Sequence, residues 1–295
     1  MKILLLGAKG QVGWELHRAL SLVGEIAAYG RQEADLAKID ALRNLVATSG
    51  AKIIVNAAAY TAVDKAETEG AQAERINHEA VGVLAAETKR LNALLVHYST
   101  DYVFDGTKAS PYIEDDHTRP INLYGATKLR GEEAIRDSGC RYLLFRTSWV
   151  YAARGGNFVK TMLRLAKERD ELNVVADQVG APTGAELIAD VTAMALNRGL
   201  PEGTYHLTAA GETSWHAFAK FILAEAQILG LALKAGPERV NAIATSSYPT
   251  PAKRPANSRL NTDKLRTGLG ISLPPWEHHV RRVIAELIGD TKAKS

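Results

Sequence analysis

The chain has 295 residues, of which 46% are hydrophobic and 23% charged, and its 36 Lys and Arg against 33 Asp and Glu give a net charge of +3. This composition is typical of an ordinary folded protein, and the absence of a Lys/Arg block argues against a nucleic-acid partner. A single cysteine, Cys140, excludes an internal disulfide framework, and the apolar runs are too short for a membrane span, so we expect a cytoplasmic protein without a membrane partner.

Strands and helices alternate along the first half of the chain. An apolar run at residues 2–6 leads through a glycine turn into a helix that begins near residue 12. Further strands are expected at 26–29, 52–56, 94–99 and 142–147, and further helices at 39–48, 71–89 and 124–137. Because each strand is a continuous apolar run, the pattern favours a parallel sheet covered on both faces. The sequence therefore predicts an α/β fold, with a doubly wound, Rossmann-like dinucleotide-binding domain over residues 1–150.

The pattern loosens after residue 150. Helices are expected at 158–168, 186–197, 215–229 and 276–288, separated by stretches that contain proline and glycine. We predict a smaller substrate-binding lobe over residues 151–295, with some segments returning to the first domain. Three prolines make residues 248–255 a shaped loop, because proline fixes φ and has no amide donor. The loop around Arg254 and Asn257 is our candidate for closing a substrate cleft, with Arg254 pairing with a diphosphate.

The turn between the first strand and the first helix has the spacing G-x-x-G-x-x-G, with glycines at Gly7, Gly10 and Gly13. Glycines at this place allow a tight turn and let a pyrophosphate approach the amide-rich start of the helix. The alternative is a turn whose glycines serve only the backbone geometry. The context of strand, turn and helix favours a dinucleotide site.

The residues after the second strand indicate which dinucleotide binds. An acid at this place would accept hydrogen bonds from the ribose 2′-hydroxyl of NADH, but the chain has Gly30 and Arg31 here. The guanidinium of Arg31 suits the 2′-phosphate of NADPH. NADPH is therefore favoured, while nearby Glu33 leaves the use of NADH open.

Two side chains at the start of the expected helix 124–137 form a possible acid–base pair. Tyr124 and Lys128 are four residues apart and so share one helix face. A cation beside a phenol favours the phenolate and lowers its pKa toward the working range of a general acid. Tyr-x-x-x-Lys alone is also common on the surfaces of helices. Ser99 and Thr100 at the end of an upstream strand add hydroxyls at the edge where open α/β sheets bind ligands.

The glycine turn, the strand-end Ser99-Thr100 pair and the Tyr124/Lys128 pair occur in the order of the extended short-chain dehydrogenase/reductase family, which the chain resembles over essentially its whole length. Within it, residues 56–67, 97–104, 146–151, 177–190 and 254–262 are similar to reductases of dTDP-linked 4-keto-6-deoxy sugars. The resemblance implies reduction of the C4 ketone of dTDP-4-dehydro-6-deoxy-L-mannose by NADPH, with NADH used less well, to give dTDP-L-rhamnose for cell-surface polysaccharide.

The resemblance also implies roles for individual residues. Tyr124 would be the proton donor, Lys128 would bind the nicotinamide ribose, and Thr100 would hold the carbonyl. Matching cofactor positions are Gly10, Gln11, Val12, Asp35, Leu36, Ala59, Tyr60, Thr61 and Tyr98. Thr100, Asp101 and Trp149 match positions that contact the sugar nucleotide, although Trp149 also suits a core anchor. A homodimer with Mg²⁺ held by Glu15, Glu186 and Glu286 is a further implication, against separate glutamates on solvated helix faces.

Two other functions fit parts of the pattern. A dinucleotide-binding regulatory subunit without catalysis would have no need of Thr100, Tyr124 and Lys128 together. A nucleotide-sugar dehydratase or epimerase would need an Asp-Glu pair after the strand-end threonine for elimination, but here Asp101 is followed by Tyr102. No histidine spacing indicates a metal or catalytic site, and His97 is predicted to pack within its strand.

Overall fold

The centre of this computed structural model, which describes residues 1–292, is a six-stranded parallel sheet in the order β10-β5-β4-β3-β1-β2. The strands are β1 (Lys2–Leu6), β2 (Glu25–Tyr29), β3 (Ile53–Asn56), β4 (Leu94–Thr100), β5 (Arg141–Thr147) and β10 (Gly203–His206). From β1 the chain passes to β2 on one side and then to β3 on the other. The predicted α/β, doubly wound fold is confirmed.

Alternate residues of the strands enter two separate cores. Ile3 and Leu5 of β1 pack with α1 (Gln11–Ala19) and α8 (Ala185–Arg198) on one face of the sheet. Leu4 and Leu6 pack on the other face, against α2 (Ile39–Thr48), α5 (Ala80–Arg90) and α6 (Leu123–Ser138). Burial on both faces explains why the strands read as continuous apolar runs.

The helix expected over residues 71–89 has an irregular middle. It is divided into α4 (Gly70–Glu74), a π-helical turn at Arg75–Glu79, and α5. The wider turn brings the backbone of Asn77 against α6, where a Cβ on Gly131 would lie 2.2 Å from the Asn77 carbonyl oxygen. Such π turns are often found at functional sites, and apolar periodicity does not predict them.

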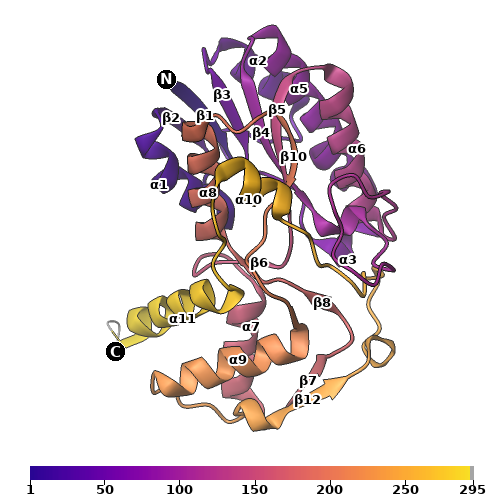
Figure 1. The fold of residues 1–295 in the computed structure, drawn as a ribbon, viewed down its shortest axis with the longest axis vertical. Coiled ribbons are helices and arrows are strands. Elements are labelled where there is room, and N and C mark those ends of the chain that lie inside the picture. Colours follow the sequence, from indigo (N-terminus) through magenta and orange to yellow (C-terminus); the bar gives the residue numbers. More distant parts are fainter. Residues whose placement is uncertain (293–295) are drawn as a thin grey trace.

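The second half of the chain contributes to both parts of the molecule. Figure 1 shows α7 (Phe158–Glu168), α9 (Trp215–Ile228) and α11 (Trp276–Lys292) below the sheet, whereas α8 and α10 (Asp263–Leu269) lie beside it. β10 extends the sheet by pairing with β5. The division of the chain near residue 150 remains a prediction. No helix in the described part of the chain combines the length and the apolar character of a membrane span.

Short elements complete the structure. Small strand pairs are formed by β6 (Val150–Tyr151) with β9 (Thr183–Gly184), β8 (Val179–Gly180) with β11 (Thr213–Ser214), and β7 (Leu172–Val175) with β12 (Val240–Ile243). One further α-helix is α3 (Val63–Ala66), and 3₁₀ turns lie at Leu20–Leu22, Asp101–Val103, Pro237–Arg239 and Thr245–Ser247. The predicted loop at 248–255 has no regular helix or strand.

Candidate active site

A cleft of about 920 Å³ opens at the carboxyl ends of the central strands. It lies where the chain changes direction across the sheet, between β1 and β3, which is the usual ligand site of such folds. Most of the predicted cofactor and substrate residues line it: Gly7, Gly10, Gln11, Val12, Arg31, Asp35, Leu36, Ala59, Tyr60, Thr61, Tyr98, Thr100, Asp101, Tyr124, Lys128 and Trp149. Gly13, Arg254 and Asn257 are not among the lining residues.

Two glycines of the turn are required by close backbone contacts. Gly7 has φ +79°, and a Cβ there would lie 2.7 Å from the amide nitrogen of Ala58. A Cβ on Gly13 would lie 2.0 Å from the carbonyl oxygen of Gly7, so this glycine allows α1 to pack against the turn. No side chain caps the start of α1, which leaves its amide groups at Gln11 and Val12 available to an anion.

The carboxyl end of β2 carries charged groups of both signs. Arg31 is largely exposed and lies 3.9 Å from the carboxylate of Asp35. Glu33 accepts a hydrogen bond from the amide of Gly30 at 3.0 Å and an ion pair from Lys9 at 3.1 Å. Two cations, Lys9 and Arg31, therefore line the cleft next to this strand end.

Tyr124 occupies the first turn of α6. The side chain of Asn122 caps this helix by accepting a hydrogen bond from the Gly125 amide at 2.8 Å. Gly125 lets the helix approach the segment after β4, since a Cβ there would lie 2.1 Å from the carbonyl oxygen of Tyr102. The cap and this close contact hold Tyr124 opposite Thr100 at the end of β4.

The nitrogen of Lys128 is bound by groups of β4. It donates to the carbonyl oxygen of Tyr98 at 2.7 Å and lies 3.1 Å from Nε2 of His97. Partial burial raises the pKa of the Tyr124 phenol, and a hydrogen bond with Thr100 opposes this rise. The effect of Lys128 on the acidity of this phenol stays a prediction, because the contacts of the lysine nitrogen described here are to β4.

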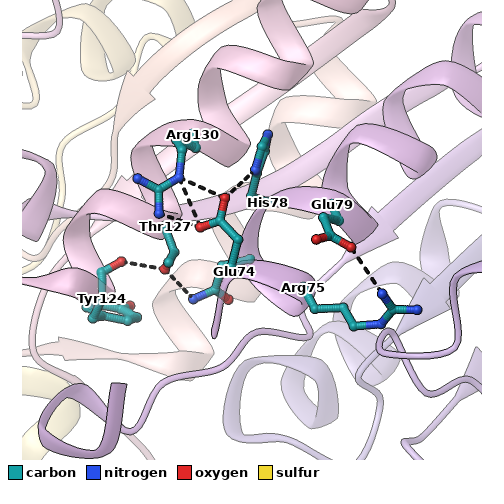
Figure 2. A network of polar contacts seen from close by, with 8 residues as sticks. Glu74, Arg75, His78, Glu79, Tyr124, Thr127 and Arg130 are labelled. Atoms are coloured by element: carbon teal, nitrogen blue, oxygen red, sulfur yellow. Dashed lines mark hydrogen bonds and ion pairs between the residues drawn. The ribbon is translucent and has the colours of Figure 1, made fainter. Parts of the chain in front are cut away.

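A second set of contacts joins α6 to the π turn at Arg75–Glu79. The hydroxyl of Thr127 donates to the Tyr124 carbonyl at 2.8 Å and accepts from the amide of Asn77 at 3.1 Å. Asn77 also pairs with both backbone groups of Tyr60, at 2.9 and 3.0 Å, in the segment predicted to contact the cofactor. Figure 2 shows Thr127 beside Tyr124 and, farther along α6, Arg130 on Glu74. The π turn thus links the two halves of the site.

Two oxygens at the cleft lack a hydrogen-bond partner. They are the hydroxyl of Thr147 and one carboxylate oxygen of Asp101, both buried and both on lining residues. Burial raises the pKa of Asp101 to about 7, against the opposing effect of the Ser258 and Thr100 hydroxyls. Because buried polar atoms are nearly always paired in native proteins, these oxygens indicate a polar ligand.

Two stacked indoles form one wall of the cleft. Trp149 has φ +48°, a left-handed conformation that is uncommon for a large side chain, and its ring lies 3.6 Å from that of Trp215. Gly180 also packs against this side chain, where a Cβ would lie 2.7 Å from the Trp149 ring. Contacts with Trp215 and Gly180 thus fix the ring of Trp149 at the edge of the cleft.

The two predicted loop residues, Arg254 and Asn257, have partners within the chain. Arg254 binds the carboxylate of Asp64 at 2.7 Å, which ties the loop to α3. The amide of Asn257 donates to the carbonyls of Lys108 and Ser110 at 2.7 and 2.9 Å, and its oxygen accepts from Arg259. Asn257 therefore braces the loop, and both of its donors are used away from the cleft.

Two of the three glutamates predicted to hold a metal are paired with arginines. Glu15 on α1 binds Arg18, and Glu186 on α8 binds Arg282, each at 3.1 Å, while Glu286 lies on α11. Over residues 1–292 no three acidic, histidine or cysteine side chains gather into a metal site.

Some lining residues were missed by the sequence analysis. Asn56 ends β3 and follows the same strand-end rule that identified Thr100. Asn157, the cap of α7, donates to the side chain of Gln11 at 2.9 Å, and Trp215 begins α9. Both come from distant parts of the chain, and no local pattern places them at the cleft.

Known proteins resemble the chain over its full length. The family described as RmlD substrate binding domain matches residues 1–288. The dTDP-4-dehydrorhamnose reductase of Burkholderia thailandensis is 53% identical to this chain over 98% of the chain and 99% of the relative. That of Escherichia coli K12 is 48% identical over 99% of the chain and 99% of the relative. The crystal structure of dTDP-4-dehydrorhamnose reductase from Bacillus anthracis in complex with NADP has a TM-score of 0.89 and 35% identity, covering 97% of this chain and 99% of that one.

Proposed function

The chain belongs to the RmlD substrate binding domain family, and from this membership and its site we propose that it reduces the C4 ketone of dTDP-4-dehydro-6-deoxy-L-mannose with NADPH. The product is dTDP-L-rhamnose, and the reaction is the last step in making this nucleotide sugar. The observation that carries the proposal is the meeting of Thr100, Tyr124 and Lys128 in one cleft with the glycine turn.

The chemistry divides between cofactor and protein. When bound, NADPH supplies the hydride that reduces C4. Tyr124 donates the proton to the carbonyl oxygen, and the hydroxyl of Thr100 holds that oxygen at the end of β4. The ammonium form of Lys128 stabilises the phenolate that remains on Tyr124. The buried position of Lys128 gives its charge a stronger effect than it would have in water.

The cleft suits the dinucleotide in shape and charge. Gly7 and Gly13 keep the turn close to α1, and the uncapped amides of that helix face the place for a pyrophosphate. Lys9 and Arg31 offer cations for a 2′-phosphate, although Glu33 must give up its pairing with Lys9 for both to bind it. This arrangement favours NADPH and allows weaker use of NADH.

Polar and aromatic side chains are available to bind the sugar nucleotide. The unpaired oxygens of Asp101 and Thr147 find partners in the hydroxyls of a sugar. Trp149 offers a flat apolar surface to the sugar ring or its methyl group. Arg254 lies on the loop opposite and, after release from Asp64, pairs with a diphosphate.

Two alternative functions fit less well. A dehydratase or epimerase needs a second carboxylate after Asp101, but this chain has Tyr102 there. The Tyr102 ring packs edge-on against Tyr124, with the ring centres 5.8 Å apart. A regulatory subunit does not require a fully buried lysine beside a tyrosine at the floor of a cleft. The geometry therefore favours a reductase.

One assay tests the function directly. The purified protein is mixed with NADPH and the dTDP-4-keto sugar, NADPH absorbance is followed, and the product is identified by NMR. We expect oxidation of NADPH with formation of dTDP-L-rhamnose and slower oxidation of NADH. Loss of the sugar without oxidation of cofactor would support the epimerase, and no turnover at all would support the regulatory subunit.

Assembly and metal binding belong to the same proposal. We propose a cytoplasmic homodimer with Mg²⁺ bound by Glu15, Glu186 and Glu286. What supports it is that α1 packs against α8, so Glu15 and Glu186 lie on adjoining helices, and that hard carboxylate oxygens suit Mg²⁺. The carboxylates of Glu15 and Glu186 are held by arginines within one chain, so the site needs a second copy. Sedimentation with and without EDTA tests this: the dimer should loosen on chelation, and an unaltered mass would contradict a bridging metal.

A further inference from the structure

Three buried side chains form a continuous line under the floor of the cleft. Asn56 at the end of β3 lies 3.1 Å from Nδ1 of His97 on β4, and Nε2 of the same ring lies 3.1 Å from Nζ of Lys128. Each of the three is only 1% exposed. Asn56 and His97 are direct partners in the register of the two strands, so the sheet itself fixes the first contact.

The hydrogen atoms along this line can be assigned from its outer end. Oδ1 of Asn56 accepts from the amide of Ala58 at 3.2 Å, so its Nδ2 is the atom that faces His97. A ring nitrogen that faces an N–H must carry no hydrogen itself, which places the single hydrogen of a neutral imidazole on Nε2. That hydrogen points at Lys128, whose nitrogen accepts it only as an uncharged amine.

The charged form of Lys128 fits the same contacts poorly. An ammonium donates and cannot accept, so Nε2 of His97 would lose its hydrogen and Nδ1 would carry it against the N–H of Asn56. Turning the Asn56 amide over would relieve this contact but would place its NH₂ against the Ala58 amide. Burial acts in the same direction, since it lowers the pKa of Lys128 to about 8 and that of His97 well below its ordinary value.

Other ionisable groups surround Lys128 and bear on its charge. Glu132, one turn farther along α6, favours the ammonium, but Glu132 is itself paired with Arg146 of β5 at 2.7 Å. Tyr124 on the same helix and Asp101 at the end of β4 complete the set that lines or adjoins this part of the cleft. The Tyr98 carbonyl, at 2.7 Å, accepts a hydrogen bond from the amine and from the ammonium alike. Since the carboxylate of Glu132 is already paired, the side chain that distinguishes the two forms of Lys128 at hydrogen-bond distance is His97.

We propose that His97, held by Asn56, is a positioning residue that fixes the nitrogen of Lys128 and sets when that nitrogen carries a proton. This rests on the proposed function, because it concerns the lysine assigned to stabilise the Tyr124 phenolate. His97 does not touch substrate or cofactor. It acts through Lys128. When the lysine is an uncharged amine, His97 donates a hydrogen bond to Nζ, and the lysine becomes charged only when the hydrogen bonds from Asn56 to Lys128 are rearranged.

NMR of the unliganded protein tests the assignment without any substrate. With ¹⁵N-labelled histidine, the ring of His97 should show a hydrogen on Nε2, a bare Nδ1, and no protonation of the ring between about pH 5 and about pH 9. A hydrogen on Nδ1, or a ring that titrates near the ordinary histidine value, would overturn the proposal. Because no turnover is involved, a negative sugar assay would defeat the proposed function without changing this result.

The variant Asn56→Asp should reverse the direction of the hydrogen bonds from residue 56 to Lys128. A carboxylate accepts from Nδ1–H, so Nε2 becomes bare and accepts from the Lys128 ammonium. We expect the hydrogen of His97 to move to Nδ1 in the NMR spectrum, and the alkaline limb of kcat against pH to move up by about one unit. His206→Gln is the control, since His206 is also buried but bonds the Tyr112 carbonyl rather than Lys128, and the alkaline limb of this variant should not move. An unshifted limb in Asn56→Asp would contradict the proposal.

A double-mutant cycle separates positioning from general damage. His97→Gln should shift the alkaline limb in the wild-type background and have no effect on the pH profile in a Lys128→Met background, because its only route is the lysine. Equal effects in both backgrounds would show a structural role alone. Thermal melts identify variants that fail to fold, and for those the NMR result on the wild-type protein decides.

Discussion

At the strand ends that form the floor of the cleft (the sheet side), Thr100, Asp101 and Lys128 are at most 6% exposed. In the loop region formed by residues 248–258 and α3 (the loop side), the side chains of Arg254 and Asp64 are 24% and 40% exposed. The first group is held by strand ends, a capped helix and the contacts of Asn77. The second depends on an ion pair between a proline-rich loop and a short helix. The comparison teaches that the reacting groups are fixed before ligands arrive, while the opposite wall stays adjustable.

The buried ion pair of α6 and β5 should show the largest effect on stability. Arg146 binds Glu132 through two nitrogens, and both side chains are almost fully buried. Arg146→Met leaves the Glu132 carboxylate without its main partner, so the free energy of unfolding in denaturant should fall by about 3–5 kcal/mol. Arg141→Met on the same strand is the control, because its pair with Glu202 is exposed and should change stability by less than about 1 kcal/mol. Equal losses would mean that the sheet side is not the more rigid region.

Removing the proton donor should show the largest effect on rate. Tyr124→Phe is expected to lower kcat by about 10²-fold or more, with NADPH affinity nearly unchanged, because only the hydroxyl is lost. Steady-state kinetics and cofactor titration measure the two effects. Tyr102→Phe is the matched control, since Tyr102 packs against Tyr124 in the same cleft but has no proposed chemical role. Unchanged turnover in Tyr124→Phe would remove this residue from the mechanism.

A smaller effect is expected at the exposed end of β2. Arg31→Ala should raise the KM for NADPH by about tenfold, equivalent to roughly 1.4 kcal/mol, and the KM for NADH much less. Arg43→Ala on α2 is the control, because Arg43 is exposed and does not line the cleft. If both cofactors respond equally, Arg31 does not recognise the 2′-phosphate.

The smallest effect is expected where the loop is tied down. Arg254 lowers the pKa of Asp64 from its ordinary value of 3.8, so the pair stabilises the fold above that pH and the gain is lost as pH falls through the lowered value. Asp64→Asn should cost about 0.2–1 kcal/mol at neutral pH, and this difference should disappear in acid. Limited proteolysis should cut residues 248–258 faster in the variant. Resistance equal to wild type would show that other contacts hold the loop.

The sequence could predict most of the sheet side, and the reason is local. Continuous apolar strands, a glycine turn and the spacing of Tyr124 and Lys128 are properties of short segments, and the fold they imply is confirmed. The direction of the Lys128 nitrogen was not predictable, because its partners Tyr98 and His97 belong to another element. His97 is buried as predicted, but its place between Asn56 and Lys128 follows only from strand register.

The loop side was less predictable because its contacts join distant segments. Asp64 and Arg254 are 190 residues apart, and nothing near either one identifies its partner. Asn257 is predicted to contact the substrate because it lies on the proline-rich loop, but its amide donates to two backbone carbonyls. The pairing of Trp149 with Trp215 likewise needs the second half of the chain to return to the cleft.

The stacked indoles give the molecule its own optical reporter. Only four tryptophans occur in the chain, and two of them, Trp149 and Trp215, lie ring against ring on lining residues of the cleft. A ligand that settles on this wall changes the polarity around both rings at once, so intrinsic fluorescence should register sugar-nucleotide binding without any label. Occupancy of the indole wall can then be timed separately from turnover at Tyr124.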